Sequence, residues 1–476
     1  MWPDRQARVK ANALAPGAAA PPLLERAIND IMWAMFSFLK KSKPAQGAGS
    51  GPVVYTRPEH CISRKNIDHD ALRVLYRLAN LGYTAYLVGG GVRDLLLGRK
   101  PKDFDVGTSA LPNEVKRAFH NCFLIGRRFR LAHIKFGPKI IETATFRRES
   151  RTVGEIIEHA ADGPQEDNTF GTPETDAFRR DFTINGLFYN IRDFSVIDWV
   201  GGMKDLQAKV IRAIGDPDIR FQEDPVRMMR AIKFASRLGF TIEPKTAAAM
   251  KRHHACILNA SVPRVCEEVF RLFTYGHSSE AFRMMWEYRM LHDLVPEVSD
   301  AITKTGGENS PLWRYLDVLD EYDSMRRTSG GEPSNALRAA VLSTVMLKLR
   351  DGGMTSRKAV APVLQHLHIS KGIYFSSVLI LESVRRLSQP PSRGKSRFVK
   401  SKDFADALDY NRIIARAEGR DERALDEWAV LYEREEAAAR RRAAEAAKEA
   451  DQAEAKAIRK AAEDAEAADR EARGEE

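Results

Sequence analysis

The sequence predicts an α+β protein in which a head of strands and helices precedes a long helical remainder. Between His60 and about residue 205, short runs of β-branched and aromatic residues alternate with helical patterns. Beyond residue 240, one segment after another carries apolar residues at helical spacing. The chain has 476 residues, which is too many for one ordinary core. We therefore expect two or more domains.

Residues 1–59 precede the head and are rich in Ala, Pro, Gly and Ser without a sustained period. This composition predicts a disordered N-terminal extension. Because an Ala- and Pro-rich segment comes before them, we expect Met32 or Met35 to be the natural start of translation. The head then opens with a helix from about His60 to Leu81, which carries apolar residues at helical spacing and is followed by Gly82.

The stretch from Tyr86 to Thr108 organises the head. It reads YLVGGGVRDLLLGRKPKDFDVGT, an apolar run followed by three glycines and, further on, by Asp103 and Asp105. Glycines directly after a strand let backbone amides approach a phosphate, and the start of the following helix favours anions. In a strand, Asp103 and Asp105 would leave the same face, where a divalent cation would hold both ionised. This combination predicts metal-assisted phosphoryl or nucleotidyl transfer.

A helix from Leu111 to Phe119 and three strands come next. The strand candidates are Phe123–Ile125, His133–Phe136 and Ile140–Phe146. Alternation in the last of them places Glu142 on a largely apolar face, where an unpaired charge is costly. Glu142 is therefore either a third acid of the metal site or a residue of an edge strand that turns to solvent.

A polar segment from Glu149 to about Asp176 predicts a long surface loop. After it, the sequence FRRDFTINGLFYNI from Phe178 to Ile191 predicts an amphipathic helix. Arg179 and Arg180 could meet phosphates, and Asp181 could cap this helix. The alternative is an ordinary capped helix whose arginines are solvated.

A further helix is predicted from Phe221 to Phe240, with Pro225 in its first turn and Gly239 at its end. On its polar face Asp224 and Arg227 are three residues apart, so they could meet each other or one planar ligand. The alternative is a charged face that contacts only water.

The remainder of the chain predicts helices joined by short turns. A basic linker rich in Pro and Ser, residues 388–400, suits the phosphates of a nucleic acid. From Glu433 onward large apolar residues are few and regular heptads are missing, which predicts a single charged helix or a disordered tail and no coiled coil. The predicted helices are Lys245–His253, Pro263–Tyr275, Ser278–Met290, Leu312–Asp323, Asn335–Leu349, Gly372–Leu387, Ser401–Tyr410 and Asp421–Leu431.

Charge and cysteine content limit the possible partners and the compartment. The formal net charge is +10, and because residues 433–476 carry −4, residues 1–432 carry +14. This excess favours a polyanionic partner, nucleic acid first. The four cysteines are scattered without zinc-site spacing, which predicts a reduced intracellular protein with no structural zinc. No apolar run approaches the roughly 20 residues that span a bilayer.

The motifs LVGGGVRDLLLG, KPKDFDVGT, RRDFTING and EDPVRMMRAIKFA follow one another in this order. Together they resemble the class II tRNA nucleotidyltransferase and bacterial poly(A) polymerase family, over residues 60–280. The stretch GRRFRLAH at 126–133 and the lead-in at 60–78 are similar to the bacterial poly(A) polymerase I subgroup. That subgroup often ends in a strongly basic tail, whereas this chain ends net acidic.

The resemblance implies a small, polymerase-beta-like nucleotidyltransferase head with a mixed sheet, followed by an all-α neck, body and tail. The head would occupy residues 60–205. The neck, residues 206–275, would select the nucleotide, and the body, residues 276–432 with the basic linker 388–400, would bind RNA. Residues 433–476 would form the tail.

The resemblance also implies roles for single residues. Asp103, Asp105 and Glu142 would hold the metal, and Asp181 would join the two aspartates in catalysis. Asp224 and Arg227 would read the base of the incoming nucleotide. The complete nucleotide-binding set would be Gly89, Gly90, Arg93, Asp94, Arg180, Asn185, Asp224 and Arg227.

The implied activity is template-independent addition of AMP from ATP to RNA 3′ ends by a two-metal mechanism with Mg²⁺. The nearest alternative is CCA addition to tRNA by the same site. An alternative of another class is a non-catalytic RNA-binding protein that has kept the fold. We further expect a cytoplasmic monomer without a membrane partner.

Overall fold

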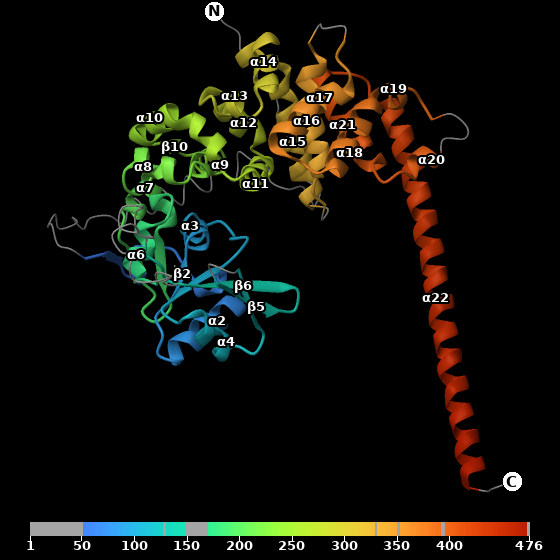
Figure 1. The fold of residues 1–476 in the computed structure, drawn as a ribbon, viewed down its shortest axis with the longest axis horizontal. Coiled ribbons are helices and arrows are strands. Elements are labelled where there is room, and N and C mark those ends of the chain that lie inside the picture. The colour runs from blue at the N-terminus through green and yellow to red at the C-terminus, as the bar shows by residue number, and fades with distance from the viewer. Residues whose placement is uncertain are drawn as a thin grey trace, which may run out of the picture. The chain divides into compact units, whose positions relative to one another are not determined.

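The computed structural model describes residues 51–126, 130–148, 170–328, 331–349, 353–391 and 396–473. The chain forms two compact units, Met1–Gln207 and Ala208–Glu476 (Figure 1). The first unit, the head, contains a large sheet, and the second is almost entirely helical. The predicted α+β class with a mixed-sheet head followed by helices is confirmed.

The sheet of the head has eight strands. They are β1 (Val53–Tyr55), β2 (Ala85–Val88), β3 (Asp105–Thr108), β4 (Cys122–Ile125), β5 (Leu131–Phe136), β6 (Lys139–Thr145), β7 (Leu187–Asn190) and β8 (Val196–Asp198). Their order across the sheet is β1-β8-β7-β2-β3-β6-β5-β4. β3 and β6 are parallel, and the other neighbouring strands of this sheet are antiparallel.

Short helices and 3₁₀ turns connect these strands. The helices of the head are α2 (His69–Asn80), α3 (Gly90–Leu96), α4 (Pro112–Ala118), α6 (Pro173–Phe178) and α7 (Gly202–Ala208). The 3₁₀ turns are η1 (Arg57–Glu59), η2 (Arg64–Asn66) and η4 (Thr183–Asn185).

The two faces of the sheet differ in what covers them. On one face, α2 and α4 pack against the strands, and Leu75 and Leu78 of α2 are fully buried together with Val106 of β3 and Ile134 of β5. On the other face, an apolar cluster lies over β2, β7 and β8. This cluster consists of Val88, Phe146, Ala177, Phe188 and Ile197, with Tyr86, Trp199 and Val200 packed against it.

The N-terminal edge of the sheet corrects one prediction. We predict a disordered extension over residues 1–59, but residues 53–59 form β1 and η1. β1 pairs with β8, so that Val53 stands opposite Asp198. The head therefore begins before residue 60, and residues 1–50 lie outside the part of the chain that the structure describes.

The helix predicted from His60 begins only at His69. Asp68 is its N-cap and accepts hydrogen bonds from the amides of Asp70 and Ala71, at 2.9 and 3.3 Å. A carboxylate in this position satisfies amides that have no partner within the helix. The preceding residues form η1 and η2 instead.

An amphipathic helix is predicted from Phe178 to Ile191, and this prediction is wrong. The segment contains η4 and then β7, whose residues 187–189 are buried in the middle of the sheet. A strand that is buried on both faces reads as a continuous apolar run, which periodicity cannot distinguish from a helix. Of the loop predicted over residues 149–176, residues 149–169 lie outside the part of the chain that the structure describes. Its last four residues, 173–176, belong to α6.

The second unit begins with a small parallel pair of strands, β9 (Val210–Ile211) and β10 (Thr241–Ile242), and is otherwise helical. Its first helices are α8 (Pro217–Glu223), α9 (Val226–Leu238), α10 (Pro244–His253), α11 (Val262–Leu272), α12 (Ser278–Glu287), α13 (Met290–Leu294), α14 (Pro296–Lys304) and α15 (Pro311–Thr328). They are followed by α16 (Asn335–Leu347), α17 (Ser356–Leu367), α18 (Lys371–Glu382), α19 (Val384–Leu387), α20 (Ser396–Val399), α21 (Phe404–Glu418) and α22 (Arg423–Arg473).

The helix predicted from Phe221 to Phe240 is broken into α8 and α9. Asp224 adopts φ −142°, ψ 89° between them, and Pro225 precedes the first residue of α9. Proline lacks an amide hydrogen and disfavours helical geometry in the residue before it, so the break falls where the sequence places the proline. Gly239 ends α9 in the left-handed region, as predicted.

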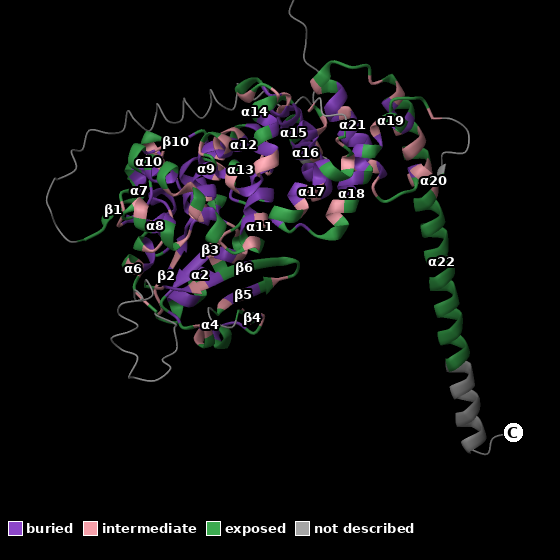
Figure 2. Ribbon diagram, turned by 45° about the horizontal axis from the view of Figure 1, so that its top comes forward, coloured by how far each residue is buried: buried purple, intermediate pink, exposed green. Residues whose placement is uncertain are grey.

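Helix α16 lies at the centre of the second unit. Every residue from Ala336 to Met346 is buried, and α14, α15, α17, α18 and α21 pack around it (Figure 2). In the second unit, the helices α13, α14, α17 and α20 are absent from the prediction. Pro362 lies inside α17, where proline argues against a helix on propensity alone.

The C-terminal segment is a single helix, α22, through Arg473, which is one of the two predicted forms. An aromatic cluster anchors its first turns: Trp428 and Tyr432 lie 6.0 and 5.2 Å from Phe404, between ring centroids. Residues 439–461 are all exposed (Figure 2). In the described part of the chain, no helix is long and apolar enough to cross a membrane.

Asp320 of α15 supports a stability prediction for the second unit. Its two carboxylate oxygens accept hydrogen bonds from the amides of Ser278 and Ser279, at 2.9 and 3.1 Å, where α12 begins. Asp320→Ala should lower the free energy of unfolding by about 2–4 kcal/mol, because it leaves two buried amides without partners. Urea denaturation followed by circular dichroism measures this. Glu321→Ala, an exposed neighbour on the same helix, should change it by no more than about 0.5 kcal/mol.

The same side chain should make stability depend on pH. Burial raises the pKa of Asp320 to about 6, although two amides favour its charged form. The native protein then binds this proton more tightly than the unfolded chain does. The resulting stabilisation is fully present below about pH 4 and is lost as the pH rises through about 6. Asp320→Asn should therefore gain stability relative to wild type between pH 4 and pH 7, and a constant difference would contradict this assignment.

Candidate active site

The glycine-rich turn between β2 and α3 packs closely against other predicted site residues. Gly89 adopts φ +69°, ψ −134°, a conformation that favours glycine. A Cβ atom on Gly89 would lie 2.9 Å from Nη1 of Arg180, and one on Gly91 would lie 3.3 Å from the carbonyl oxygen of Asp103. The absence of side chains on these glycines therefore lets the turn approach Arg180 and the backbone of Asp103.

Asp105 and Glu142, two of the predicted metal ligands, are neighbours in the sheet. Asp105 is the first residue of β3, and Asp103 precedes the strand. β3 and β6 are parallel, with Val106 opposite Thr143. Both of these residues are buried, so the residues before them, Asp105 and Glu142, adjoin each other on the other face. The structure thus brings Asp105 and Glu142 together.

Glu142 occupies a position that neither sequence alternative describes fully. β6 lies between β3 and β5, inside the sheet and not at its edge. The side chain of Glu142 is nevertheless 52% exposed, and its Oε1 lies 3.8 Å from Nε2 of His133. The carboxylate therefore turns to solvent from an interior strand.

The carboxylates of this site influence one another. Burial, followed by the charges of Glu142 and Asp103, raises the pKa of Asp105 to about 6, while Arg180 acts in the opposite direction. Such oxygen donors are the ligands that Mg²⁺ prefers. Within the described residues, no three His, Cys, Asp or Glu side chains are arranged to hold a metal ion as they stand.

Arg93, Asp94, Asn185 and Asp181 form a hydrogen-bond network beside the glycine turn. Arg93 is 2% exposed and donates to Oδ1 of Asp94, at 2.9 and 2.7 Å, and to Oδ1 of Asn185, at 2.6 Å. Nδ2 of Asn185 donates to Oδ1 of Asp181, at 2.9 Å. The structure brings these four predicted residues together, in contacts that link α3 to η4.

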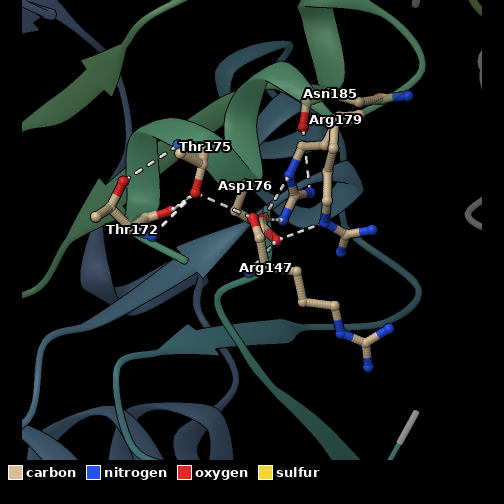
Figure 3. Close-up of polar contacts among 7 residues, drawn as sticks. Arg147, Thr172, Thr175, Asp176, Arg179 and Asn185 are labelled. Atoms are coloured by element: carbon tan, nitrogen blue, oxygen red, sulfur yellow. Dashed lines mark hydrogen bonds and ion pairs between the residues drawn. The ribbon is translucent and has the colours of Figure 1, made fainter. Parts of the chain in front are cut away.

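Asp176 of α6 is a site residue that the sequence interpretation missed (Figure 3). Its side chain is 4% exposed. One carboxylate oxygen accepts from Nε of Arg179 at 2.9 Å and from the amide of Arg147 at 3.3 Å. The other accepts from Nη2 and Nε of Arg180, at 2.7 and 3.1 Å. The positions of the two arginines, three and four residues after Asp176, are a signal that could have revealed it.

The charge of Asp176 fixes the position of Arg180. Burial raises the pKa of Asp176, but Arg180 and Arg179 outweigh burial and hold the pKa below its ordinary value. Nη1 of Arg180 also donates to the carbonyl oxygen of Asn185, at 3.3 Å. Arg180 is therefore held between α6 and η4, next to Gly89.

Asp224 and Arg227 belong to the second unit. They are predicted to share one helix face, but Asp224 lies between α8 and α9 and only Arg227 lies on α9. Oδ2 of Asp224 accepts from Nη2 of Arg264 at 2.9 Å, and Oδ1 is buried without a hydrogen-bond partner among the described residues. Nη1 of Arg227 donates to Glu223, at 3.2 Å, and to the carbonyl oxygen of Arg220, at 3.1 Å. Burial, followed by the charge of Arg220, lowers the pKa of Arg227.

Two regions of the chain match known protein families. Residues 85–212 match the family described as "Poly A polymerase head domain". Residues 239–302 match the family described as "Probable RNA and SrmB- binding site of polymerase A". Of the stretch at 126–133 that distinguishes the predicted subgroup, residues 127–129 lie outside the described residues.

Several curated proteins are similar to about half of the chain. Poly(A) polymerase I of Escherichia coli is 49% identical over 280 residues, which are 57% of this chain and 59% of that protein. Poly(A) polymerase I of Haemophilus influenzae is 41% identical over 247 residues, 51% of this chain and 55% of that protein. The CCA-adding enzyme of Bacillus subtilis is 36% identical over 224 residues, 47% of this chain and 55% of that enzyme. The chain thus spans little more than half the length of the curated relatives it matches.

The fold also matches a solved structure. The crystal structure of the Bacillus stearothermophilus CCA-adding enzyme in complex with CTP has a TM-score of 0.59 and 26% identity to this chain, over 77% of this chain and 82% of that one. This agrees with the predicted polymerase-beta-like class of the head. Over these regions the chain is therefore similar both to bacterial poly(A) polymerase I and to the CCA-adding enzymes.

Proposed function

We propose that this chain is a template-independent polynucleotide adenylyltransferase that adds AMP from ATP to RNA 3′ ends. The proposal is carried by the convergence of the carboxylates of β3 and β6, the glycine turn and Arg180. Nucleotidyl transfer demands alignment of the triphosphate with the acceptor and neutralisation of charge. Acidic oxygens, backbone amides that can be approached closely and a fixed guanidinium can supply both.

Sequence similarity favours AMP addition over CCA addition. The chain is 49% identical to a Poly(A) polymerase I, whereas the CCA-adding enzymes of Lactobacillus helveticus and Bacillus subtilis are 38% and 36% identical. CCA addition to tRNA remains the rival for the same site. A non-catalytic RNA-binding protein is the rival of another class, and the presence of Asp103, Asp105 and Glu142 argues against it.

Asp103, Asp105 and Glu142 would hold Mg²⁺, which when bound would activate the acceptor hydroxyl and neutralise the charge of the leaving pyrophosphate. Arg180, fixed by Asp176, would contact the phosphates of ATP. The backbone of Gly89 and Gly90 would line the same phosphates. We further propose that Arg93, Asp94, Asn185 and Asp181 keep the glycine turn in place through their hydrogen bonds.

Base selection would depend on Asp224 and Arg227. Oδ1 of Asp224 is buried and has no hydrogen-bond partner among the described residues, whereas Arg264 holds Oδ2, so Oδ1 could accept a hydrogen bond from a base that reaches it. Arg227 supplies donors whose direction Glu223 fixes. An acceptor beside such donors matches the edge of adenine, which offers an amino donor next to a ring-nitrogen acceptor. We propose that this pair accepts ATP.

The RNA acceptor would also contact the second unit. Residues 239–302, which match a family described as an RNA-binding site, would contribute to this contact, and the net charge of +14 on residues 1–432 supports a polyanionic partner. We propose that the enzyme acts in the cytoplasm as a monomer.

The nucleotide requirement distinguishes the two enzymatic functions. With ATP alone and a generic RNA, we expect 3′ tails of many adenylates, because base selection by the protein needs no template. Product lengths on a denaturing gel measure this. A tRNA that lacks its CCA end, incubated with CTP and ATP, serves as the comparison. If extension requires CTP and stops after CCA, AMP tailing is the wrong function.

Removal of one predicted metal ligand tests the site. Asp103→Ala should lower the rate of AMP incorporation more than about a thousandfold, which corresponds to a loss of about 4 kcal/mol of transition-state stabilisation. Binding of labelled RNA should change little, since the residue would act on the reaction and not on RNA affinity. Incorporation at the wild-type rate by Asp103→Ala would exclude the metal site.

The role of Asp176 gives a further prediction. Asp176→Ala should lower kcat/KM for ATP by about 10- to 100-fold, an effect of about 1.4–2.7 kcal/mol, because Arg180 loses the partner that fixes it. The KM for RNA should stay unchanged, and Asp176→Glu should recover part of the loss. Glu174→Ala, an exposed acid on the same helix, is the matched control and should behave like wild type. An equal loss for both nucleotide and RNA would indicate general damage to the head.

A further inference from the structure

We propose that the open face of β4, β5 and β6 seats upstream nucleotides of the RNA acceptor, with Phe123 as a stacking platform for one base. The inference rests on the proposed function, because it places the acceptor of that reaction. It adds a binding surface to the head, beyond the carboxylates and the glycine turn.

The register of the sheet builds one row of side chains that starts at the carboxylates. Glu142 adjoins Asp105 across the parallel pair of β3 and β6. On its other side Glu142 stands opposite His133, and His133 stands opposite Phe123. Residues directly opposite each other in a sheet point to the same face. Phe123 therefore shares a face with the predicted metal ligands.

The spacing of the strands gives the reach of this row. Neighbouring strands are about 4.8 Å apart, so three steps from β3 to β4 place Phe123 about 14 Å from Asp105. Stacked bases rise about 3.4 Å each, so a base on Phe123 would lie roughly two to four nucleotides upstream of the reacting end, depending on how extended the strand is.

Among the residues that the structure describes, none of the apolar cover found over the rest of this face extends over β4, β5 and β6. Over β2, β7 and β8 the same face is covered by the cluster around Phe188. Over the outer strands, Phe123 is 58% exposed, Ile125 50% and Ile140 47%. On the opposite face of these strands, Ala132, Ile134 and Ile141 are buried. Figure 2 shows the exposed tip of the β5–β6 hairpin. The large exposed apolar side chains of these strands therefore lie on one face of the sheet.

The chemistry of the open face fits single-stranded nucleic acid. An exposed aromatic ring stacks on any base, which suits an acceptor of variable sequence. Lys135 is exposed on the same face and can meet a phosphate, and the ring of His133 is 24% exposed between Phe123 and Glu142. Exposed apolar residues on an edge strand promote unwanted pairing unless the surface has a partner. Continuity with the carboxylates makes the RNA acceptor that partner.

Phe123→Ala tests the proposal. With an oligoadenylate of twelve or more nucleotides as acceptor, the KM for RNA should rise about 5- to 100-fold, the loss expected for one stacked base. The KM for ATP should stay unchanged. With a dinucleotide acceptor, which does not reach β4, the variant and wild type should behave alike. Phe123→Trp should restore the RNA affinity, whereas Phe123→Leu, apolar but not aromatic, should not.

Tyr76→Ala is the matched control, because Tyr76 is an aromatic residue, 37% exposed, on α2, which packs against the opposite face of the same sheet. It should leave the KM for RNA at the wild-type value. An unchanged melting temperature for Phe123→Ala would show that the fold is intact, as expected for an exposed side chain.

The outcomes separate this inference from the proposed function. If wild type adds AMP and Phe123→Ala keeps the wild-type KM for long RNA, the stacking surface is wrong and the activity stands. If wild type adds no AMP, the activity is wrong, and fluorescence anisotropy with labelled oligoadenylate decides the inference: weaker binding by Phe123→Ala supports it and equal binding overturns it. A change of oligomeric state with unchanged RNA affinity would assign the surface to a protein contact and overturn it too.

Discussion

The parallel pairing of β3 with β6 is the constraint on which the head depends. Val106 of β3 and Thr143 of β6 stand opposite each other, and both are buried on the face that α2 and α4 cover. Their burial fixes the register of the two strands. A slip of one residue would reverse every side chain of a strand, so that Glu142 would enter the core and Thr143 would face the carboxylates. The packing of the core thus sets the position of a charged group on the opposite face. Stability and site geometry follow from the same pairing.

A second constraint acts through Asp176. A buried carboxylate is costly unless it is paired, and here two guanidiniums and one backbone amide pair with it. One of these guanidiniums, that of Arg180, opposes the rise in the pKa of Asp105. Helix α6, which contributes none of the predicted metal ligands, therefore influences the charge at Asp105 through one intermediate side chain, that of Arg180.

The success of sequence interpretation varied with the range of the interactions involved. The glycine turn at Gly89 follows from local backbone preferences, and the sequence predicts it. The same interpretation includes Asp103 in the strand, whereas β3 begins only at Asp105. Asp176 was missed because it lies at the end of a polar segment whose short helix only becomes evident through its contacts. Residues 187–189 were assigned to a helix because burial on both faces removes the alternation that marks a strand. The tight contact between Gly89 and Arg180 joins residues far apart in sequence and needs the fold.

The sheet also shows how an exposed face can be reconciled with stability. A sheet that must admit a polymeric substrate on one face cannot bury that face, so the free energy of folding must come from the other. In the outer strands of the head this is the arrangement observed: Ile134 and Ile141 are buried under α4 while Ile140 and Phe123 remain exposed. The edge strand β4 is only four residues long, which limits the surface it offers for pairing with another strand. The division of the sheet into a packed face and an open face is therefore what allows the carboxylate row to be both fixed and accessible.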